Sequence, residues 1–352
     1  MSKKSTAPTA ARSVTLSDVA RLAGVSLPTA SRVLNGGVRG SGSGSPEMRE
    51  RVREAAERLG YVVNAAAQAT AAGASRALTL IVSDLDDFGA VTMISGVMHA
   101  AEARGLSVSV RATRDDAARE VQIVSALRGE RHRGVIFAAS RSSDFARESA
   151  MARALQALED VGTRVVVIGT SELPFDAVVV DNRAAAERFA RSLCSGVDGR
   201  ILIVAGPEDQ VTSRDRVAGF RDGAATAGVR IDEADVMRVP FSRDGGFQAA
   251  ALIAERVDEL GLVAAMSDAL AVGVIAGLRE HGIEPLGRLA VSGFDDVPMI
   301  SDLLPGFSTV RVPLEQFGEA AVALLVDETG ERDGSRARLV ELEAVPVVRP
   351  RA

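Results

Sequence analysis

Residues 15–36 read TLSDVARLAGVSLPTASRVLNG, and this stretch decides the fold of the first part of the chain. Thr15 and the acid three residues later, Asp18, form a capping box, which predicts that a helix begins here. Gly24 predicts the end of that helix, because glycine adopts left-handed backbone angles without steric cost. Ser26 is a preferred cap for a second helix. Two short helices joined by a tight turn that contains glycine are typical of a helix-turn-helix.

A third helix completes the predicted head. Ser45-Pro46-Glu47 supplies a cap, a first-turn proline and an acid, and Gly60 marks the end of the helix. Apolar side chains of the three helices are expected to form one core: Val19, Ala20, Leu22, Ala23, Ala30, Val33, Leu34, Val52, Ala55, Ala56 and Leu59. Any three-helix domain would show such spacing, but the caps, the turn and the charge also agree with a helix-turn-helix.

The charges of the chain are distributed unevenly. The protein has 352 residues and a formal net charge of -6. Residues 1–76 hold 11 Lys or Arg and 5 Asp or Glu, which gives this segment a balance of +6 and leaves −12 for the remainder. A small basic segment joined to a larger acidic body predicts a polyanion-binding module at the N-terminus. Lysine occurs only at Lys3 and Lys4, which excludes a Walker A phosphate loop.

From Leu78 onward, apolar strand-like runs alternate with helical stretches. The first series covers 78–84, 106–112, 134–140 and 164–170, and the second covers 177–182, 200–207, 236–241, 262–268 and 289–295. Near-continuous apolar strands that alternate with helices predict buried parallel sheets. The fold class is therefore predicted to be α/β, with two doubly wound lobes that bind ligands at the carboxyl ends of their strands.

Polar candidates for a binding site follow these predicted strands. They are Asp84, Asp86, Asp87, Arg214, Phe241, Ser267, Asp268, Asp295 and Asp296. Carboxylates accept hydroxyl hydrogens, arginine donates to ring or anionic oxygens, and phenylalanine offers a stacking face, so a cleft with these groups suits a sugar or a nucleoside. Asp84 and Asp268 are equally well explained as helix caps, because aspartate is a preferred cap.

Other chemistries find little support in the sequence. His99, His132 and His281 lie far apart and lack the spacing of metal ligands, so neither a metal site nor a cofactor is expected. Cys194 is the single cysteine, sits in an apolar helical run and is expected in the core. No Gly-x-Ser-x-Gly elbow, no membrane-spanning apolar run and no apolar signal segment is found. We therefore expect a cytoplasmic protein that is not an enzyme.

These motifs resemble a known family. TLSDVARLAGVSLPTASRVLNG and SPEMRERVREAAERLGYVVN closely resemble the N-terminus of LacI/GalR-family transcriptional regulators. The resemblance implies that a recognition helix, residues 26–34, enters the major groove of double-stranded DNA. The DNA contacts that it implies are Thr15, Ser26, Leu27, Pro28, Thr29, Ser31, Arg32, Asn35, Tyr61, Asn64, Ala67 and Thr70. Leu27 and Pro28, at the main specificity positions, read only shape or a thymine methyl, whereas Arg32 reads guanine or grips phosphate. Leu27 is alternatively a partly exposed packing residue.

The later part of the chain resembles the same family. GPEDQVTSRDRVAGF, AAMSDALAVG and VSGFDD look like motifs of its effector domain, which is related to periplasmic sugar-binding proteins. The resemblance implies that Arg214, Phe241, Ser267 and Asp295 bind the effector, and Asp87 joins them after the first strand.

Three departures from the family pattern affect this expected pocket. The family often has Asn-Pro-Phe-Phe after the first strand, whereas this chain reads Asp87-Phe88-Gly89-Ala90, so an aromatic wall is expected to be missing. Gly169 stands where some members carry an acid, and Val312 stands where a glutamine is frequent. The pocket is therefore expected to be more open or to hold something other than a common hexose.

The resemblance also implies how the chain is organised. We expect a disordered tail (1–13), a helix-turn-helix domain (14–62), a hinge helix (63–76) and an effector-binding and dimerisation domain (77–352). Within that domain, lobe 1 is expected at about 77–174 and 309–331, and lobe 2 at about 175–306 and 338–352.

The predicted function is a ligand-responsive transcription repressor, associated with the nucleoid when it is bound to its operator. A two-fold homodimer, or a higher oligomer, would place two recognition helices on a palindromic operator. A small-molecule effector would act through its different affinities for two states of the lobes. A solute-binding protein without a role on DNA is the alternative, but it predicts a signal peptide and no basic head. An α/β enzyme with a helical appendage would need a nucleophile, base or metal cluster that is not visible.

Residues 64–73, NAAAQATAAG, lie where the family has its hinge helix. In the family this helix inserts a leucine between base pairs of the minor groove, which bends the DNA. The alanines favour a helix, but Thr70 stands at the wedge position and no leucine occurs between Gly60 and Ala77. We therefore expect a helix that orders on DNA and kinks it weakly.

Replacing Thr70 by leucine should restore the missing wedge. We expect Thr70→Leu to bind the operator more tightly than the unchanged protein, because the wedge stabilises bent DNA. Gel-shift titrations of both proteins on the same operator measure the difference. Equal or weaker binding by the variant would contradict this view of the hinge.

Overall fold

The computed structural model describes residues 14–35, 44–61, 75–85, 87–130, 132–170, 172–285, 287, 289–327 and 337–350. The chain forms two compact units, residues 1–75 and residues 76–352, which we call the head and the body. Several expectations lie outside the described residues: the tail 1–13, the hinge positions Asn64, Ala67 and Thr70, and Asp86. The backbone of Asn35 is described, whereas its side chain is not.

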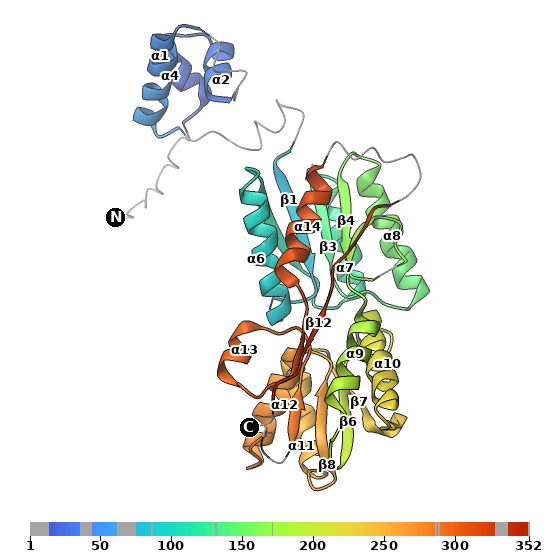
Figure 1. The fold of residues 1–352 in the computed structure, drawn as a ribbon. Coiled ribbons are helices and arrows are strands. Elements are labelled where there is room, and N and C mark those ends of the chain that lie inside the picture. Colours follow the sequence, from blue (N-terminus) through green and yellow to red (C-terminus); the bar gives the residue numbers. More distant parts are fainter. Residues whose placement is uncertain are drawn as a thin grey trace, which may run out of the picture. The chain divides into compact units, whose positions relative to one another are not determined.

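The described part of the head contains three helices, α1 (Leu16–Ala23), α2 (Leu27–Asn35) and α4 (Pro46–Leu59) (Figure 1). The Asp18 carboxylate accepts hydrogen bonds from the backbone N–H of Thr15 at 3.1 Å and from its hydroxyl at 2.6 Å, which fixes the start of α1. Gly24 has a φ of 67°, and the N–H of Val25 donates to the carbonyl of Ala20 at 3.0 Å. The predicted helix-turn-helix is therefore confirmed.

The core of the head is made of small side chains. Its buried members are Val19, Ala20, Ala23, Ala30, Val52, Ala55 and Ala56. Val33, Leu34, Leu59 and Tyr61 are partly buried against them. The predicted core position of Leu22 is wrong, because this side chain lies on the solvent side of α1 with an exposed fraction of 45%. Alanine at the helix crossings lets the backbones approach closely.

Lobe 1 of the body is built on a parallel sheet of six strands (Figure 1). The spatial order of these strands is β11-β5-β4-β3-β1-β2. Their bounds are β1 (Ala77–Val82), β2 (Ser107–Ala112), β3 (Gly134–Ala138), β4 (Arg164–Ile168), β5 (Asp176–Val179) and β11 (Leu339–Glu341). Helices α6 (Phe88–Glu102), α7 (Ala117–Leu127), α8 (Phe145–Glu159) and α14 (Leu314–Val326) flank this sheet.

Lobe 2 is built on a parallel sheet of four strands in the order β7-β6-β8-β9. Its strands are β6 (Arg200–Ala205), β7 (Val236–Arg238), β8 (Leu260–Ala265) and β9 (Ala290–Ser292). Its helices are α9 (Asn182–Leu193), α10 (Val211–Thr226), α11 (Arg243–Ala254), α12 (Asp268–Glu280) and the short α13 (Pro298–Leu303). A short 3-10 helix (Glu233–Asp235) precedes β7, and β10 (Thr309–Arg311) pairs antiparallel with β12 (Val345–Val347).

Two strands lie in a different lobe from the one expected. We placed residues from 175 to 306 and from 338 onward in lobe 2, but β5 pairs with β4, and β11 pairs with β5. The Asp176 carboxylate explains the second pairing, because it accepts hydrogen bonds from the N–H of Arg338 at 2.8 Å and from its guanidinium at 2.7 Å. Apolar strand patterns do not reveal which sheet a strand joins. The lobe of β5 and β11 is therefore decided by contacts such as the Asp176–Arg338 ion pair, which the sequence pattern does not show.

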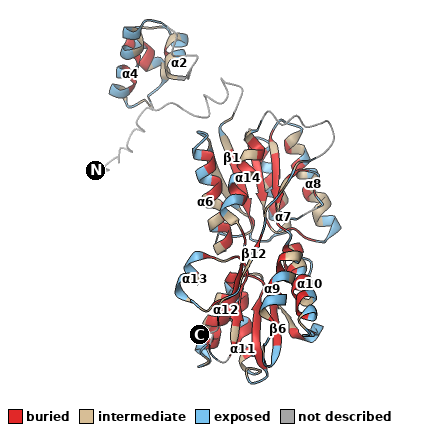
Figure 2. Ribbon diagram, in the orientation of Figure 1, coloured by how far each residue is buried: buried red, intermediate tan, exposed pale blue. Residues whose placement is uncertain are grey.

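Both sheets are covered by helices on both faces, which explains their nearly continuous apolar strands (Figure 2). In β1, Leu80 and Val82 pack toward α6 and α14, whereas Ile81 packs toward α7 and α8. In β6, Ile203 packs toward α9 and α10, whereas Val204 packs toward α11 and α12. The predicted α/β fold with two doubly wound parallel lobes is confirmed, and the carboxyl ends of the strands are free to carry polar side chains.

The packing of α9 against α10 depends on a close backbone approach at Gly219. A Cβ atom at this position would lie 2.0 Å from the carbonyl oxygen of Arg183. At Gly129, by contrast, a Cβ atom would meet nothing nearer than 3.9 Å.

We expect Gly219→Ala to destabilise the body by about 1–3 kcal/mol, because the two helices must separate to admit the methyl group. Thermal unfolding measures the loss, with Gly129→Ala as the matched control. If both variants melt at the temperature of the unchanged protein, the close packing described for α9 and α10 is wrong.

Candidate functional site: a cleft at the strand ends

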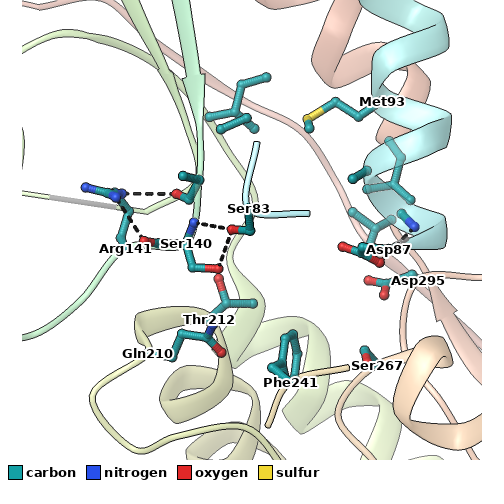
Figure 3. Close-up of a pocket in the computed structure, with 18 of the residues that line it drawn as sticks. Ser83, Asp87, Met93, Ser140, Arg141, Gln210, Thr212, Phe241, Ser267 and Asp295 are labelled. Atoms are coloured by element: carbon teal, nitrogen blue, oxygen red, sulfur yellow. Dashed lines mark hydrogen bonds between the residues drawn. The ribbon is translucent and has the colours of Figure 1, made fainter. Parts of the chain in front are cut away.

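A cavity of about 190 Å³ lies at the carboxyl ends of the strands, with side chains from both lobes in its wall (Figure 3). Lobe 1 contributes the ends of β1, β3 and β4 and the first turns of α6. Lobe 2 contributes α10 and the ends of β7, β8 and the segment after β9. Of the predicted effector-binding residues, the cavity brings together Asp87, Phe241, Ser267 and Asp295.

Arg216 is the buried centre of the lobe 2 wall, with an exposed fraction of only 6%. Its Nε donates to Asn182 at 2.8 Å, one terminal nitrogen donates to the carbonyl of Met266 at 2.8 Å, and the other donates to Asp295 at 3.0 Å. Its guanidinium also lies 3.8 Å from the centre of the Phe294 ring. All three nitrogens thus have acceptors, as a buried cation requires.

The prediction that Arg214 lines this site is wrong, and Arg216 takes its place. The side chain of Arg214 is 46% exposed, pairs with Asp215 at 3.0 Å and does not line the cavity. Residues two apart on a helix point to nearly opposite sides. The sequence carried a signal, because Val217, Phe220 and Ala224 are apolar at helical spacing. This face of α10 is buried in the structure, and Arg216 is buried with it.

Asp295 is held in an unusual backbone conformation. Its φ is 132°, and that of Asp296 is 55°. The N–H of Asp295 donates to the carbonyl of Val310 at 2.8 Å, so the residue is joined to β10, which leads back toward lobe 1. Backbone strain in residues other than glycine persists only where surrounding contacts impose it, and it is concentrated at functional sites.

Asp268 stands behind Asp295 and supports the same segment. Its carboxylate accepts from the N–H of Val297 and from the hydroxyl of Thr309, both at 2.8 Å. It does not line the cavity, and the cap of α12 is Ser267, whose hydroxyl accepts from the N–H of Leu270 at 3.1 Å. Asp268 is therefore neither a residue of the cavity wall nor the cap of α12, which are the two roles that the sequence suggests. It fixes the segment that follows β9.

The carboxyl groups near Arg216 have raised pKa values. Burial, together with the nearby carboxylates of Asp268 and Asp87, raises the pKa of Asp295 to about 7, against the lowering effect of Arg216. Burial likewise raises the pKa of Asp268 to about 6. The pKa of Asp87 is also raised, chiefly by burial, although this side chain is exposed to the open space of the cleft. Protein surrounds Asp87 on its other sides, which explains both observations.

The remaining predictions for the cavity wall concern Asp87, the missing aromatic wall, Gly169, Val312, Asp84 and Asp296. Asp87 caps α6 by accepting from the N–H of Gly89 at 3.1 Å. Gly89 and Ala90 line the cavity where the family often has aromatic residues, and Gly169 and Val312 also line it. Asp84 lines the cavity too, whereas Asp296 is outside and pairs with Arg311 and Arg349.

Several cavity residues were missed at the sequence level. They are Ser83, Asp115, Arg141, Asn182, Gln210, Thr212 and Arg216. Ser83 lies at the end of the predicted strand 78–84 and Arg141 directly follows the predicted strand 134–140, so the rule that ligands bind at strand ends was sufficient to find them. Asp115 was not foreseeable in this way, because a turn with positive φ at Arg114 and Asp115 brings it to the cavity.

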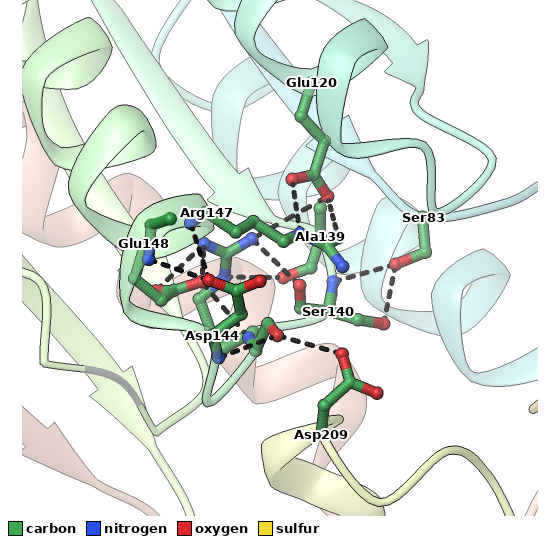
Figure 4. A network of polar contacts seen from close by, with 11 residues as sticks. Ser83, Glu120, Ala139, Ser140, Asp144, Arg147, Glu148 and Asp209 are labelled. Carbon is green, nitrogen blue, oxygen red and sulfur yellow. Dashed lines mark hydrogen bonds and ion pairs between the residues drawn. The ribbon is translucent and has the colours of Figure 1, made fainter.

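A polar network joins the two lobes at one edge of the cleft (Figure 4). The hydroxyl of Ser142 donates to the Asp209 carboxylate at 3.0 Å, and the N–H of Ser143 donates to the carbonyl of Asp209 at 2.7 Å. The lobe 1 side is fixed by Arg141, which donates to Glu148 at 3.0 Å and lies 4.3 Å from the centre of the Phe137 ring. This edge of the cleft is therefore closed in the structure.

The head presents the predicted recognition helix to solvent. The side chain of Leu27 is 47% exposed, and Pro28 and Arg32 are exposed as well. The hydroxyls of Ser26 and Thr29 bond to each other at 2.8 Å, and Nε of Arg32 donates to the carbonyl of Pro28 at 3.2 Å. The terminal nitrogens of Arg32 have no described partner, whereas Thr15 is engaged with Asp18 and Tyr61 packs on the head core.

In the described part of the chain, no group of three or more His, Cys, Asp or Glu residues is placed to hold a metal ion. Cys194 is buried, and burial raises the pKa of its thiol to about 12. Among the same residues, no helix is long and apolar enough to cross a membrane.

The raised pKa of Asp295 predicts a pH-dependent stability. The folded protein holds this proton more tightly than the unfolded chain, whose pKa is near the ordinary value of 3.8. The resulting stabilisation is full below that value and is lost as the pH rises through about 7. The melting temperature of the unchanged protein, minus that of Asp295→Asn, should therefore fall as the pH is raised from about 5 to about 8.

Thermal unfolding over this pH range checks the expectation. Asp302→Asn removes an exposed carboxyl group outside the cavity. The melting temperature of this control should depend on pH in the same way as that of the unchanged protein. A difference between the unchanged protein and Asp295→Asn that stays constant with pH would show that Asp295 is ionised throughout.

Comparison with known proteins agrees with this architecture. A model for bacterial regulatory proteins of the lacI family matches residues 15–64, and a model for a periplasmic binding protein-like domain matches residues 198–350. The HTH-type transcriptional regulator CelR of Thermobifida fusca is 30% identical over 331 residues, which cover 91% of this chain and 93% of that protein.

Solved structures show the same arrangement of elements. A transcriptional regulator CelR–cellobiose complex superposes with a TM-score of 0.67 and 28% identity, over 97% of this chain and 100% of that chain. The Lac repressor bound to ONPG in the repressed state superposes with a TM-score of 0.77, over 96% of this chain and 99% of that chain, and its 23% identity supports the fold alone. With its helix-turn-helix head and its two-lobed body, this chain belongs to the LacI family of DNA-binding transcriptional regulators.

Proposed function

We propose that this regulator is a repressor whose affinity for a palindromic operator is controlled by a small polar effector bound in the cleft of the body. The observation that carries the proposal is the buried Arg216–Asp295 pair at 3.0 Å, which lies in the wall of a cavity lined from both lobes. A preformed cavity with a few fixed polar groups is typical of small-molecule sites. We assign effector contacts to Asp87, Arg216, Phe241, Ser267 and Asp295.

The class of the effector follows from the cavity wall. Phe241 supplies one apolar face, and carboxylates and hydroxyls surround it, which suits a molecule rich in hydroxyl groups. The similarity to a regulator that was solved in complex with cellobiose supports a saccharide over a nucleoside.

We infer that the effector acts by changing the balance between two arrangements of the lobes. Asp295 is joined to β10, and the Ser142–Asp209 contact joins the lobes at the cleft edge, so a ligand between the lobes would bind the two arrangements with different affinities. Only such a difference shifts the equilibrium. A homodimer would pass the change to two heads on one operator, through a hinge at residues 63–76.

We propose that α2 reads the operator with a largely apolar first turn. Leu27 and Pro28 are exposed and offer no side-chain donors, so they fit a thymine methyl, whereas Arg32 fits guanine or phosphate. Ser26, Thr29, Ser31 and Asn35 fit backbone contacts that fix the register.

Footprinting on the promoter region of the protein's own locus tests the proposal. We expect protection of a palindromic site, and we expect a screen of saccharides to find one that alters this protection. A thermal-shift screen in parallel detects binding without DNA. If no palindromic site is protected, with or without the screened saccharides, the repressor function is wrong.

Two arginines of α10 provide a matched pair of variants. Arg216→Ala should weaken effector binding on the order of 30-fold or more, because it leaves a buried carboxylate without its partner. Arg214→Ala removes an exposed arginine two residues away and should leave effector binding unchanged. Isothermal titration with the saccharide found in the screen measures both, and operator binding without effector checks that both variants are folded. Equal effects of the two substitutions would contradict the assignment of Arg216.

A further inference from the structure

The wall of the cleft carries an excess of negative charge. Among the residues that line it, Asp84, Asp87, Asp115 and Asp295 are acidic, and only Arg141 and Arg216 are basic. Four acids against two arginines leave a formal charge of -2 on the wall. Charge of one sign in a cleft with low-dielectric walls attracts ligands of the opposite sign.

Both arginines of the wall already pair with acceptors of the protein. Arg216 donates from all three nitrogens to Asn182, Met266 and Asp295. Arg141 donates from Nε to the carbonyl of Ala139, from one terminal nitrogen to Glu148 and from the other to the carbonyl of Ser140. The two positive charges are thus matched by carboxylates of the protein, and a phosphate or carboxylate on the ligand would meet a wall of net negative charge.

Two of the carboxylates meet across the cleft (Figure 3). Asp87 belongs to lobe 1 and caps α6, whereas Asp295 follows β9 in lobe 2. The negative charge of Asp87 repels that of Asp295 and thereby contributes to the raised pKa of Asp295. Arg216 pairs with Asp295, so Asp87 has no cation in contact with it among the described residues. A cation placed between the two carboxylates would replace repulsion by attraction on both sides.

A second, uncharged acceptor in the wall is also unused. The side-chain oxygen of Gln210 is buried and has no hydrogen-bond partner among the described residues. Gln210 starts the lobe 2 side of the cleft edge, opposite Ser142, and it lines the cavity. An unsatisfied buried acceptor is costly, so a ligand that offers N–H or O–H donors gains from reaching it.

We propose that the effector is an amino sugar, with a protonated amine between Asp87 and Asp295 and with hydroxyl groups that donate to the other acceptors of the wall. This inference rests on the proposed function and specifies its effector. The amine draws Asp87 of lobe 1 and Asp295 of lobe 2 together, so the ligand that fits the cleft also favours its closed form. Neutral hexoses lack the charge, and sugar phosphates and sugar acids carry the wrong one.

Matched ligands test the proposal on the full-length protein. Isothermal titration compares D-glucosamine, D-galactosamine and D-mannosamine with D-glucose, D-galactose and D-mannose at the same pH and low salt. We expect at least one amino sugar to bind at least ten-fold more tightly than its neutral parent, and its N-acetyl derivative to lose this advantage. Raising the salt concentration should lower the affinity for the amino sugar and leave the affinity for its neutral parent unchanged.

Variants identify the carboxylate responsible. Asp87→Asn should reduce the advantage of the amino sugar over its parent by about ten-fold, whereas the control Asp302→Asn should preserve it. The ratio of the two affinities is read within each variant, so a general loss of stability does not imitate the effect.

Three outcomes overturn the proposal: neutral sugars that bind as tightly as the amino sugars, an advantage that Asp87→Asn leaves intact, or no binding by any of the amino sugars. The proposed function fails by a different measurement, namely the absence of a protected operator. A neutral saccharide that releases the operator would therefore refute the amino sugar and leave the repressor function standing.

Discussion

The buried guanidinium of Arg216 is the interaction on which the arrangement of the cleft depends. A cation that is only 6% exposed must be neutralised by the protein, and its acceptors come from three separate segments: Asn182 at the start of α9, Met266 after β8 and Asp295 after β9. The same group lies over the Phe294 ring. One side chain of α10 therefore fixes the relative positions of three loops at the carboxyl edge of the lobe 2 sheet. Removal of one partner from such a set is costly, because the other charge stays buried.

The consequences reach the connection between the lobes. Asp295 is attached to β10, Asp268 holds both Val297 and Thr309, and Asp296 pairs with Arg311, so the segment that returns to lobe 1 is fixed to the acidic side of the cleft. On the opposite edge, Ser142 and Ser143 hold Asp209. A ligand that contacts Asp295 therefore acts on the segment through which the lobes are joined. That physical continuity within the body is the basis for proposing that the cleft controls DNA binding.

The sequence allowed much of this architecture to be predicted, and its errors have physical causes. Helix caps and glycines placed the three head helices correctly, because these signals are local. The lobe of β5 and β11 was mistaken, because an apolar strand is alike in either sheet and the deciding contact joins Asp176 to Arg338, far apart in the chain. The family motif predicts Arg214 as the binding arginine, whereas the buried face of α10 carries Arg216. The place of Asp115 in the cavity wall depends on a backbone turn with positive φ, and no pattern of residue types predicts this turn.

The central claim is that the effector binds between the lobes, in contact with the Arg216–Asp295 pair. A crystal structure of the full-length protein with the saccharide that alters operator protection tests this claim most directly. The account predicts electron density for the saccharide in the cleft, with one of its oxygen or nitrogen atoms within hydrogen-bond distance of Arg216 or Asp295. Density for the saccharide at another place, with the cleft empty and the Arg216–Asp295 pair unchanged, would contradict it.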